Sequence, residues 1–457
     1  MTACDILVLG AGPAGALTAM LLNARGYRVC VVSAVNRQVR FEGLSDRVRG
    51  ILGAHECRHA LAAVGPTVER HVVWNGAEPE ARNREALVER GAFDLGLRQD
   101  LVDRGIDLAE ATVARISRRD GVWSVDAKGP DGEREIEGRY LVEARGRRAP
   151  RKAGVALSGP ETTALSREIH DLPHRPMTLI ATYRDGWLWA ISGGQGHGIV
   201  QLFVDGTGGR LPKAGELDRF FAAEVEMVPE LRDWIGQGRF HEKAVARNAT
   251  SYRAAGLVDA GAIRVGDAAA GVDPLSGHGM FEALGSALAA SAAVHTIIAK
   301  PENTALAQAF YRERAEQAHL RYCRVGRDFY AMERRWPERP FWRARATWPD
   351  DEPAHAPPYA GPVEIVARPV IEDGFVVERQ VCVTPDHPRG VWRVAEVPLA
   401  DLVQALHGHE GTALDTHMPA LGAAFEVTED QLATALAWLR ARRMLAEGGT
   451  IRLIDPA

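Results

Sequence analysis

Three glycines near the N-terminus have the spacing that cradles a phosphate. They are Gly10, Gly12 and Gly15, in the pattern G-x-G-x-x-G. In this pattern the first glycine permits a tight turn, the second lets a diphosphate approach the backbone, and the third lets a helix pack closely on a strand. The chemistry expected here is therefore the binding of a dinucleotide, with its diphosphate at the N-terminus of a helix.

The flanking sequence supplies the elements that this turn needs. An apolar run over residues 5–9 predicts a strand, and apolar residues from Leu17 to Leu22 have the spacing of a helix. Arg25-Gly26 ends that helix, and a second apolar run over residues 27–32 predicts a second strand. Strand, glycine turn, helix and strand form the first unit of a dinucleotide-binding fold, so the glycine pattern is a strong signal here.

Polar residues further along are candidates for the rest of the cofactor site. Ser33 ends the second strand, where many dinucleotide folds place an acid for the ribose, and its hydroxyl could take that role. The segment 40–50 is rich in arginine and includes Arg47; it could touch the cofactor phosphates or form a solvated loop. After Arg90, apolar residues spaced by four predict a helix that ends at Gly105.

The composition excludes several classes of function. The chain has 457 residues, 46% of them hydrophobic, and a formal net charge of -5 at pH 7. This charge gives no general attraction to nucleic acid or to an anionic membrane, so we expect neither as a partner. The five cysteines are scattered without a CxxC pattern, and we expect no signal peptide and no apolar stretch suited to span a bilayer. We expect a cytoplasmic protein with reduced thiols and no metal site.

Changes of pattern along the chain predict its domain organisation. Residues 1–153 and 256–300 are expected to form two parts of the dinucleotide-binding domain, and residues 154–255 an antiparallel sheet. A charged helical segment and a Pro-rich linker or wrapped loop follow over residues 301–362. Residues 363–457 predict a small domain of strands and helices, whose end could be a winged-helix unit and which we expect to dock a partner.

Three of these pieces carry a resemblance to a known family. The Gly10–Gly15 turn, the segment from Arg90 to Asp94 and Leu97, and the Gly266–Gly279 stretch together resemble the FAD-dependent monooxygenases of the p-hydroxybenzoate hydroxylase fold. That group also includes geranylgeranyl reductases and flavin-dependent halogenases. The resemblance covers roughly residues 1–300. It implies an α/β fold with a Rossmann-like FAD-binding domain of the p-hydroxybenzoate hydroxylase and glutathione reductase type and an antiparallel substrate-domain sheet, followed here by the small C-terminal α+β domain.

The resemblance also implies roles for single residues. Arg90 would touch the cofactor, Val113 would run along the adenine, and Asp267 would bind a ribose or ribitol hydroxyl through its carboxylate. The turn from Pro274 to Met280 would lie against the flavin pyrimidine, where backbone N–H groups and a helix N-terminus can stabilise negative charge. The full set of expected FAD-binding residues is Gly10, Gly12, Pro13, Ala14, Gly15, Ser33, Arg47, Arg90, Val113, Asp267, Pro274, Gly277, Gly279 and Met280.

One element departs from the family pattern. The Asp-Gly of the hydroxylases is replaced here by Glu143-Ala144-Arg145-Gly146, and Arg147 and Arg148 follow. These arginines could meet the phosphates of NAD(P)H or form a solvated surface.

A second motif narrows the branch of the family. The run from Trp187 to Ser192, Trp-Leu-Trp-Ala-Ile-Ser, resembles the Trp-x-Trp-x-Ile-Pro signature of flavin-dependent tryptophan halogenases. Residues two apart in a strand share a face, so Trp187 and Trp189 are candidates for a substrate wall, although packing alone could also explain them. Halogenases need a lysine between the glycine motif and the mid-domain helix, but the first lysine here is Lys128. Oxygen insertion or reduction is therefore favoured over halogenation.

Within this branch the chain resembles the maturation flavoproteins of quinohemoprotein amine dehydrogenases. These hydroxylate a tryptophan of the immature small subunit on the way to cysteine tryptophylquinone. The resemblance implies that NAD(P)H or another electron donor reduces FAD, that O₂ is captured as a C4a-hydroperoxide, and that oxygen passes to an indole. His278 is the candidate catalytic residue, and Asp46, Glu56 and Asp273 are further candidates for a base.

Three other functions stay open on the sequence alone. The chain could be a small-molecule aromatic hydroxylase, a flavin reductase of the geranylgeranyl type, or a flavin-bound chaperone that holds an immature partner without turnover.

Overall fold

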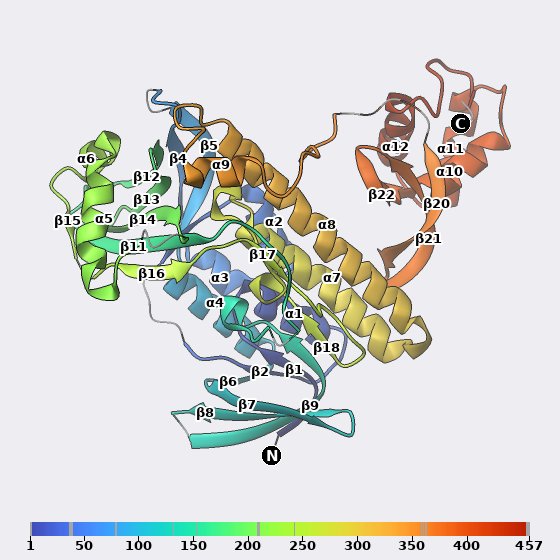
Figure 1. Ribbon diagram of the computed structural model, residues 1–457. Helices are drawn as coiled ribbons and strands as arrows, with labels where there is room; N and C mark the ends of the chain where they lie inside the picture. Colours follow the sequence, from blue (N-terminus) through green and yellow to red (C-terminus); the bar gives the residue numbers. More distant parts are fainter. Residues whose placement is uncertain are drawn as a thin grey trace. The chain divides into compact units, whose positions relative to one another are not determined.

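The structure is a computed structural model that describes residues 2–35, 40–77, 80–130, 132–151, 153–207, 211–241, 243–357, 359, 361 and 363–453. The chain divides into two compact units (Figure 1). The first consists of Met1–Val294 and Tyr311–Ala354, and the second of His295–Phe310 and His355–Ala457. The domain boundaries expected from the sequence remain predictions, and the one at Pro362 lies outside the described residues.

The first unit contains a sheet with a parallel centre. Its strand order is β6-β2-β1-β9-β8-β7, and β18 pairs with β9. The pairs of β1 with β2 and β9, of β2 with β6 and of β9 with β18 are parallel, whereas β7, β8 and β9 form antiparallel hairpins. Every residue of β2 is buried, as expected for a parallel strand covered on both faces. The strands are β1 (Thr2–Leu9), β2 (Val29–Val32), β6 (Asp107–Ala109), β7 (Thr112–Arg119), β8 (Val122–Gly129), β9 (Gly132–Glu143) and β18 (Ala262–Arg264).

Helices in this part of the chain follow the predicted apolar spacing. Pro13 stands in the first turn of α1, where its fixed φ suits a helix start. The helix predicted after Arg90 is present as α4, with Phe93, Leu97 and Leu101 buried along one side. These helices are α1 (Pro13–Asn23), α2 (Asp46–Ala54), α3 (Arg58–Ala62), α4 (Arg90–Asp103), α7 (Gly279–Ala299) and α8 (Thr304–Ala331). The end of α7 and the start of α8, over His295–Phe310, belong to the second unit.

Helix α7 differs from one sequence-based expectation. Among the described residues it is a helix long and apolar enough to cross a membrane by length and composition, whereas we expected no such stretch. However, 67% of its apolar window is buried inside the protein. Burial on that scale is typical of a core helix, so its composition is weak evidence for a membrane span.

A second, mainly antiparallel sheet also belongs to the first unit. Its order is β15-β11-β14-β13-β12-β4-β5-β3, and β16 pairs with β11. Residues 41–89, which lie outside the predicted 154–255 segment, supply β3, β4 and β5, and β4 joins β12 in parallel. The strands are β3 (Phe41–Leu44), β4 (Val64–Val73), β5 (Glu80–Glu89), β11 (Thr162–His170), β12 (Pro176–Tyr183), β13 (Gly186–Gly193), β14 (His197–Asp205), β15 (Arg239–Phe240) and β16 (Val245–Asn248). A smaller sheet joins β10 (Val155–Ser158), β17 (Tyr252–Ala254) and β19 (Ala270–Gly271).

The two faces of the antiparallel sheet have different surroundings. On one face, Leu188 packs in a core with Phe221 and Leu231. Those two residues come from the helices α5 (Leu217–Glu226) and α6 (Pro229–Ile235). Because side chains alternate along a strand, Trp187 and Trp189 lie on the opposite face. On that face Trp187 is buried against Tyr330 of α8, whereas Trp189 is half-buried.

Residues 336–354 pack within the first unit, although their sequence pattern suggested a linker or wrapped loop. They contain the helix α9 (Pro340–Ala346), in which Phe341 and Trp342 are buried. The indole Nε1 of Trp342 donates a hydrogen bond to the backbone oxygen of Tyr183, at 3.2 Å. Two buried aromatic side chains remove a large apolar area from water, which outweighs the turn-forming tendency of the neighbouring prolines.

The second unit has strands followed by helices, as its sequence predicted. The order β20-β21-β22 forms one sheet and β23-β24 another, and the helices pack on them through buried residues such as Leu402, Leu436 and Leu439. Helix α12 begins with a capping box between Thr428 and Gln431. The elements are β20 (Glu364–Glu372), β21 (Phe375–Thr384), β22 (His387–Val391), β23 (Arg393–Val394), β24 (Val397–Pro398), α10 (Leu399–His407), α11 (Leu414–Phe425) and α12 (Glu429–Ala441).

Candidate active site

The Gly10–Gly15 turn connects β1 to α1, and two of its glycines are required by sterics. Gly10 has a φ of +110°, and a Cβ there would lie 2.5 Å from the backbone oxygen of Ala144. A Cβ on Gly15 would lie 2.0 Å from the backbone oxygen of Gly10. Gly12 differs, because a Cβ there would meet no heavy atom of the described residues within 4 Å. The middle glycine therefore faces open space, where a ligand can approach the backbone.

The start of α1 fits a negatively charged ligand. Gly12 is its N-cap residue, and within the described part of the chain no side chain caps it. The first N–H groups of a helix have no partner inside the helix, and the helix dipole adds partial positive charge at this end. Open space, free N–H donors and positive potential are what a diphosphate needs, so these residues fit the FAD diphosphate.

The η3 segment (Gly266–Ala268) brings Asp267 to the same place. Gly266 has a φ of +55°, and a Cβ there would lie 2.8 Å from the Cβ of Ala14. This close approach puts η3 against the first turn of α1. The Asp267 side chain is 42% exposed, and one of its carboxylate oxygens lies 3.5 Å from the Nε of Arg147. The carboxylate is thus accessible to the hydroxyls of a bound dinucleotide.

Arg90 is enclosed by acidic side chains at the start of α4. Its Nε and Nη2 donate to Asp94, at 3.1 and 2.8 Å, and its Nη1 donates to Glu42. Arg40 also approaches Asp94, at 3.6 Å. Burial alone would lower the pKa of Arg90, but the charges and hydrogen bonds of Glu42 and Asp94 together outweigh burial, so this pKa lies above its usual value. The guanidinium is fixed in position, and its contact with a cofactor remains a prediction.

An arginine of α4 that the sequence analysis did not identify, Arg98, contacts the end of β2. Ser33 is half-buried, and its hydroxyl lies 3.3 Å from the backbone oxygen of Ala34. The Nη1 of Arg98 donates to the backbone oxygen of Ser33, at 3.2 Å, and its Nη2 lies 3.7 Å from a carboxylate oxygen of Glu110. Arg98 follows Arg90 by about two helical turns, and this spacing was the available signal. It is a further candidate for the ribose end of the cofactor.

Two other residues expected to contact FAD lie on the elements β7 and α2. Val113 is half-buried on β7, opposite Ala127 of β8. Arg47 is exposed in the first turn of α2, which caps its N-terminus with Ser45. The contacts of Val113 and Arg47 with FAD remain predictions.

The arginines after β9 differ in the hydrogen bonds and ion pairs that they make with the rest of the protein. Arg145 donates through Nε to the carboxylate of Glu143, at 2.9 Å. Arg147 donates through Nη1 to the backbone oxygen of Thr250, at 2.7 Å, besides its ion pair with Asp267. Arg148 has no acidic partner among the described residues, and its neighbours include other arginines.

Arg148 stands in a cluster of like charges. It contributes to lowering the pKa of both Arg40 and Arg247, after the larger effect of burial. The Nε of Arg40 is also buried with no hydrogen-bond partner among the described residues. Mutual repulsion of these guanidiniums favours an anion between them.

The turn expected at the flavin leads from η4 (Pro274–Ser276) into α7. The carboxylate of Asp273 caps η4 by accepting a hydrogen bond from the backbone N–H of Leu275, at 2.9 Å. Gly277 adopts a left-handed conformation with a φ of +67°, which favours glycine. Gly277 and Gly279 are exposed, whereas Met280 is buried. The positive end of α7 is therefore accessible at this turn.

His278 has a defined orientation in that turn. Its Nδ1 and the backbone oxygen of Ser276 are hydrogen-bonded, so in the neutral imidazole the proton belongs on Nδ1. The ring stacks on Tyr322 of α8, with 4.6 Å between the ring centroids. Any role of His278 as a base would therefore fall to Nε2, and its catalytic role remains a prediction.

The Trp-x-Trp motif forms an aromatic surface on β13. Trp187 lies opposite Phe203 of β14, and the two rings stack with 3.9 Å between centroids and 12° between planes. Trp189 is half-buried and packs with Phe41 and Ile191. Its Nε1 is a buried donor without a partner in the described part of the chain. Substrate contact by the two tryptophans remains a prediction.

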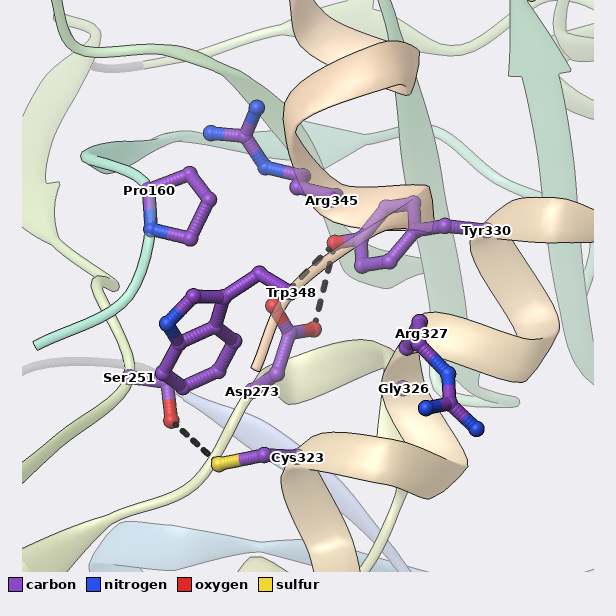
Figure 2. Close-up of a pocket in the computed structure, with 9 residues that line it drawn as sticks. All are labelled: Pro160, Ser251, Asp273, Cys323, Gly326, Arg327, Tyr330, Arg345 and Trp348. Carbon is purple, nitrogen blue, oxygen red and sulfur yellow. Dashed lines mark hydrogen bonds between the residues drawn. The ribbon is translucent and has the colours of Figure 1, made fainter. Parts of the chain in front are cut away.

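Tyr330 of α8 links this aromatic surface to the turn. The Nε1 of Trp187 donates to the Tyr330 hydroxyl, at 3.1 Å, and that hydroxyl donates to the carboxylate of Asp273, at 3.1 Å. Figure 2 shows Tyr330 and Asp273 facing one another across the dashed bonds. Burial raises the pKa of Asp273, and burial next to that carboxylate raises the pKa of Tyr330. No sequence motif had marked Tyr330, because it lies 143 residues from Trp187.

A small pocket adjoins this link. It contains about 260 Å³ of empty space, part of it open to solvent. Figure 2 shows its lining: Pro160, Ser251, Asp273, Cys323, Gly326, Arg327, Tyr330, Arg345 and Trp348. Ser251 contacts both Cys323, at 3.5 Å, and the Nε2 of His319, at 3.2 Å. Burial lowers the pKa of His319 to about 4, so its imidazole is neutral at physiological pH.

Comparisons with known proteins give a consistent result. The structure of QhpG, described as a peptidyl tryptophan dihydroxylase essential for tryptophylquinone cofactor biogenesis, is similar with a TM-score of 0.81 and 35% identity, over 96% of this chain and 99% of that one. The flavin-dependent halogenase CmlS has the same fold, with a TM-score of 0.74 and 18% identity, over 100% of this chain and 98% of that one.

A sequence relative and the family models complete the comparison. A tryptophan 2-halogenase of Chondromyces crocatus is 28% identical over 372 residues, which are 74% of this chain and 70% of that protein. No family model matches the sequence. The chain belongs to the family of FAD-dependent monooxygenases and halogenases of the p-hydroxybenzoate hydroxylase fold that includes QhpG.

Proposed function

We propose that this protein hydroxylates a tryptophan side chain of a partner protein during biogenesis of a quinone cofactor. The partner that we expect is the immature small subunit of an amine dehydrogenase, and the expected product leads to cysteine tryptophylquinone. The observation that carries the proposal is the similarity to QhpG over almost the full length of both chains. A shared fold alone would not support it, because the same fold serves halogenases too.

The proposed reaction consumes one O₂ and two electrons for each hydroxyl group. The chemistry that bound FAD supplies is activation of O₂ and transfer of one oxygen atom to an electron-rich ring. A C–H bond of the indole becomes C–OH, and the second oxygen atom leaves as water. NAD(P)H, or another electron donor, provides the two electrons, and NAD(P)H becomes NAD(P)⁺ while one further proton is taken up.

The residues of this chain would bind, orient and exclude water. The Gly12 turn and Asp267 would hold FAD, and the cluster around Arg148 would meet the phosphates of a nicotinamide donor. The half-buried ring of Trp189 would orient the indole of the substrate by contact, and the buried stack of Trp187 and Phe203 would support it. A dry aromatic wall also limits loss of activated oxygen to water.

The position of Lys128 supports oxygenation over halogenation. Lys128 is the first lysine of the chain and lies on β8 of the parallel-centred sheet. Its side chain is 63% exposed, and its Nζ lies 2.6 Å from the carboxylate of Glu133. An exposed lysine paired on a hairpin is not positioned at the Trp187 surface, which lies on a different sheet.

We also propose that the reaction takes place in the cytoplasm. The five cysteines are all free and buried. Free thiols are typical of proteins in reducing compartments, where disulfides are rare.

Oxygenation of a protein-bound tryptophan is the direct test. The purified FAD-loaded protein would be mixed with the immature small subunit, NAD(P)H and ¹⁸O₂, and the subunit would be analysed by tryptic mass spectrometry. We expect one or two ¹⁸O atoms on a single tryptophan. The matched controls are a subunit with that tryptophan replaced by phenylalanine, and the Gly12→Val enzyme without bound FAD.

Each other outcome identifies a different function. Oxygen on free aromatic compounds but not on the subunit would overturn the protein-substrate proposal in favour of a small-molecule hydroxylase. Tight binding of the subunit with no change in mass would indicate a chaperone. Incorporation of chloride or bromide in place of oxygen would indicate a halogenase.

A further inference from the structure

Arg70 lies on the same sheet face as the aromatic surface. It is on β4, opposite Thr178 of β12, and Thr178 lies opposite Ile191 of β13. Directly opposed residues share a face, and Ile191 shares its face with Trp189, two residues earlier. The Arg70 side chain is 27% exposed, so it borders solvent on a largely apolar face.

A buried carboxylate fixes the orientation of Arg70. Its Nε donates to Glu85 Oε1, at 3.0 Å, and its Nη2 donates to the other carboxylate oxygen. The Glu85 side chain is only 3% exposed. A Cβ on Gly43 would lie 1.7 Å from Glu85 Oε2, so only glycine leaves room for this carboxylate. Two parallel hydrogen bonds to a buried acid leave the guanidinium little freedom to rotate.

The remaining nitrogen of Arg70 faces the Gly277 turn. Its Nη1 lies 3.9 Å from the position that a Cβ on Gly277 would occupy. The structure gives Nη1 no acceptor within its described ranges, although this nitrogen carries two N–H groups. A guanidinium stays charged at any physiological pH. A fixed cation with free donors therefore points at an exposed turn.

Two positive groups meet at this turn, which requires an explanation. The exposed start of α7 carries the positive end of the helix dipole, and Arg70 adds a positive charge nearby. The acid in the first turn of α7, Glu282, pairs with Arg314. The two repel each other unless a group with negative charge or acceptor oxygens lies between them. The Glu85 carboxylate offsets the charge of Arg70 only in part, because it occupies the other edge of the guanidinium.

We propose that Arg70, oriented by Glu85, contacts the flavin at the Gly277 turn and stabilises the negative charge that FAD carries after two-electron reduction. This inference rests on FAD lying along that turn. It makes Arg70 a catalytic residue that favours reduced over oxidised flavin, and Glu85 a positioning residue that acts through it.

The midpoint potential of bound FAD tests the proposal independently of turnover. In Arg70→Gln holoenzyme we expect about a tenfold loss of preference for reduced over oxidised FAD, which for a two-electron couple is a shift of about 30 mV to more negative potential. Glu85→Gln should shift the potential in the opposite direction, because it leaves the charge of Arg70 uncompensated. Arg70→Lys should lose much of the effect as well, because a single ammonium cannot both pair with Glu85 and reach the flavin.

Arg239→Gln is the matched control for the loss of one arginine. Arg239 is in the same unit, is 82% exposed and pairs with Asp171. Its removal should leave the potential unchanged. If Arg70→Gln or Glu85→Gln retains FAD with the wild-type potential, the proposal is overturned, while FAD binding and tryptophan hydroxylation stand. If Arg70→Gln and Glu85→Gln shift the potential in opposite directions but the protein does not oxygenate the subunit, the role of Arg70 is supported and only the proposed function is overturned.

Discussion

Replacing Tyr330 with phenylalanine removes a single oxygen atom that joins two parts of the candidate site. That hydroxyl accepts a hydrogen bond from Trp187 Nε1 and donates one to Asp273. The substitution keeps the ring and its edge contacts with Phe341 and Trp342. The aromatic surface and the turn then lose their hydrogen-bonded link without loss of packing.

The expected cost follows from the burial of the groups left behind. Trp187 is 3% exposed and Asp273 is 8% exposed, so water cannot easily replace the lost hydroxyl. A buried donor without an acceptor costs about 1–3 kcal/mol. Asp273 keeps its bond from the Leu275 N–H, so its further loss is smaller. We expect about 2–3 kcal/mol in total, or a fall in Tm of a few degrees for a unit of this size.

The assay compares thermal unfolding of Tyr330→Phe and Tyr322→Phe holoenzymes. Tyr322 is a matched control because it is also buried on α8, and no hydrogen bond of its hydroxyl is found among the described residues. Its loss should change Tm little. In a Trp187→Phe background, Tyr330→Phe should cost at least about 1 kcal/mol less, because no indole donor is left unsatisfied.

The yield of hydroxylated tryptophan per electron pair consumed should fall in the same variants that lower Tm. If the link holds Trp187 in place beneath the half-buried Trp189, Tyr330→Phe should waste more reducing equivalents as H₂O₂ for each hydroxylated tryptophan. Equal Tm values for the two tyrosine variants, with no coupling to Trp187, would refute the reasoning that the hydroxyl links the two parts of the site.

Three further outcomes are expected. Gly12→Val should give colourless protein, because the side chain fills the open space at the α1 N-terminus; a yellow variant, seen by absorbance, would contradict the diphosphate assignment. Burial lowers the pKa of His319 to about 4, so the free energy of unfolding should fall by about 3 kcal/mol as the pH drops from 6.5 to 4. In denaturant titrations, His319→Gln should make the free energy of unfolding depend less on pH over this range. Arg148→Ala should raise the KM for NAD(P)H about tenfold. The rate at which O₂ oxidises the dithionite-reduced protein should not change. An unchanged KM would indicate that NAD(P)H binds elsewhere.

The sequence predicted those parts of the fold that local patterns determine. The glycine turn is encoded within six residues, and both the positive φ of Gly10 and the open space at Gly12 follow from that short pattern. The helix α4 follows from the apolar spacing of Phe93 and Leu97. The placement of both tryptophans on one face of β13 follows from the two-residue period of a strand.

Contacts between distant segments were not accessible in this way. Residues 41–89 join the antiparallel sheet through partners more than 100 residues away, such as Arg70 and Thr178. The slot that Gly43 leaves for Glu85 has no signature in the sequence, because its glycine and its acid lie on neighbouring strands. Pairing between strands depends on side-chain contacts that form only after the chain has folded.

The surroundings of the candidate bases indicate what the site contributes to the reaction. Asp46 is exposed and pairs with Arg49, and Glu56 pairs with Arg58. Asp273 is buried, and its carboxylate already accepts bonds from Leu275 and Tyr330. None of these carboxylates is both buried away from water and free of a hydrogen-bond or ion-pair partner. An indole reacts with an electrophilic oxygen without prior loss of a proton, so the proposed reaction needs an oriented ring and an excluded solvent more than it needs a base.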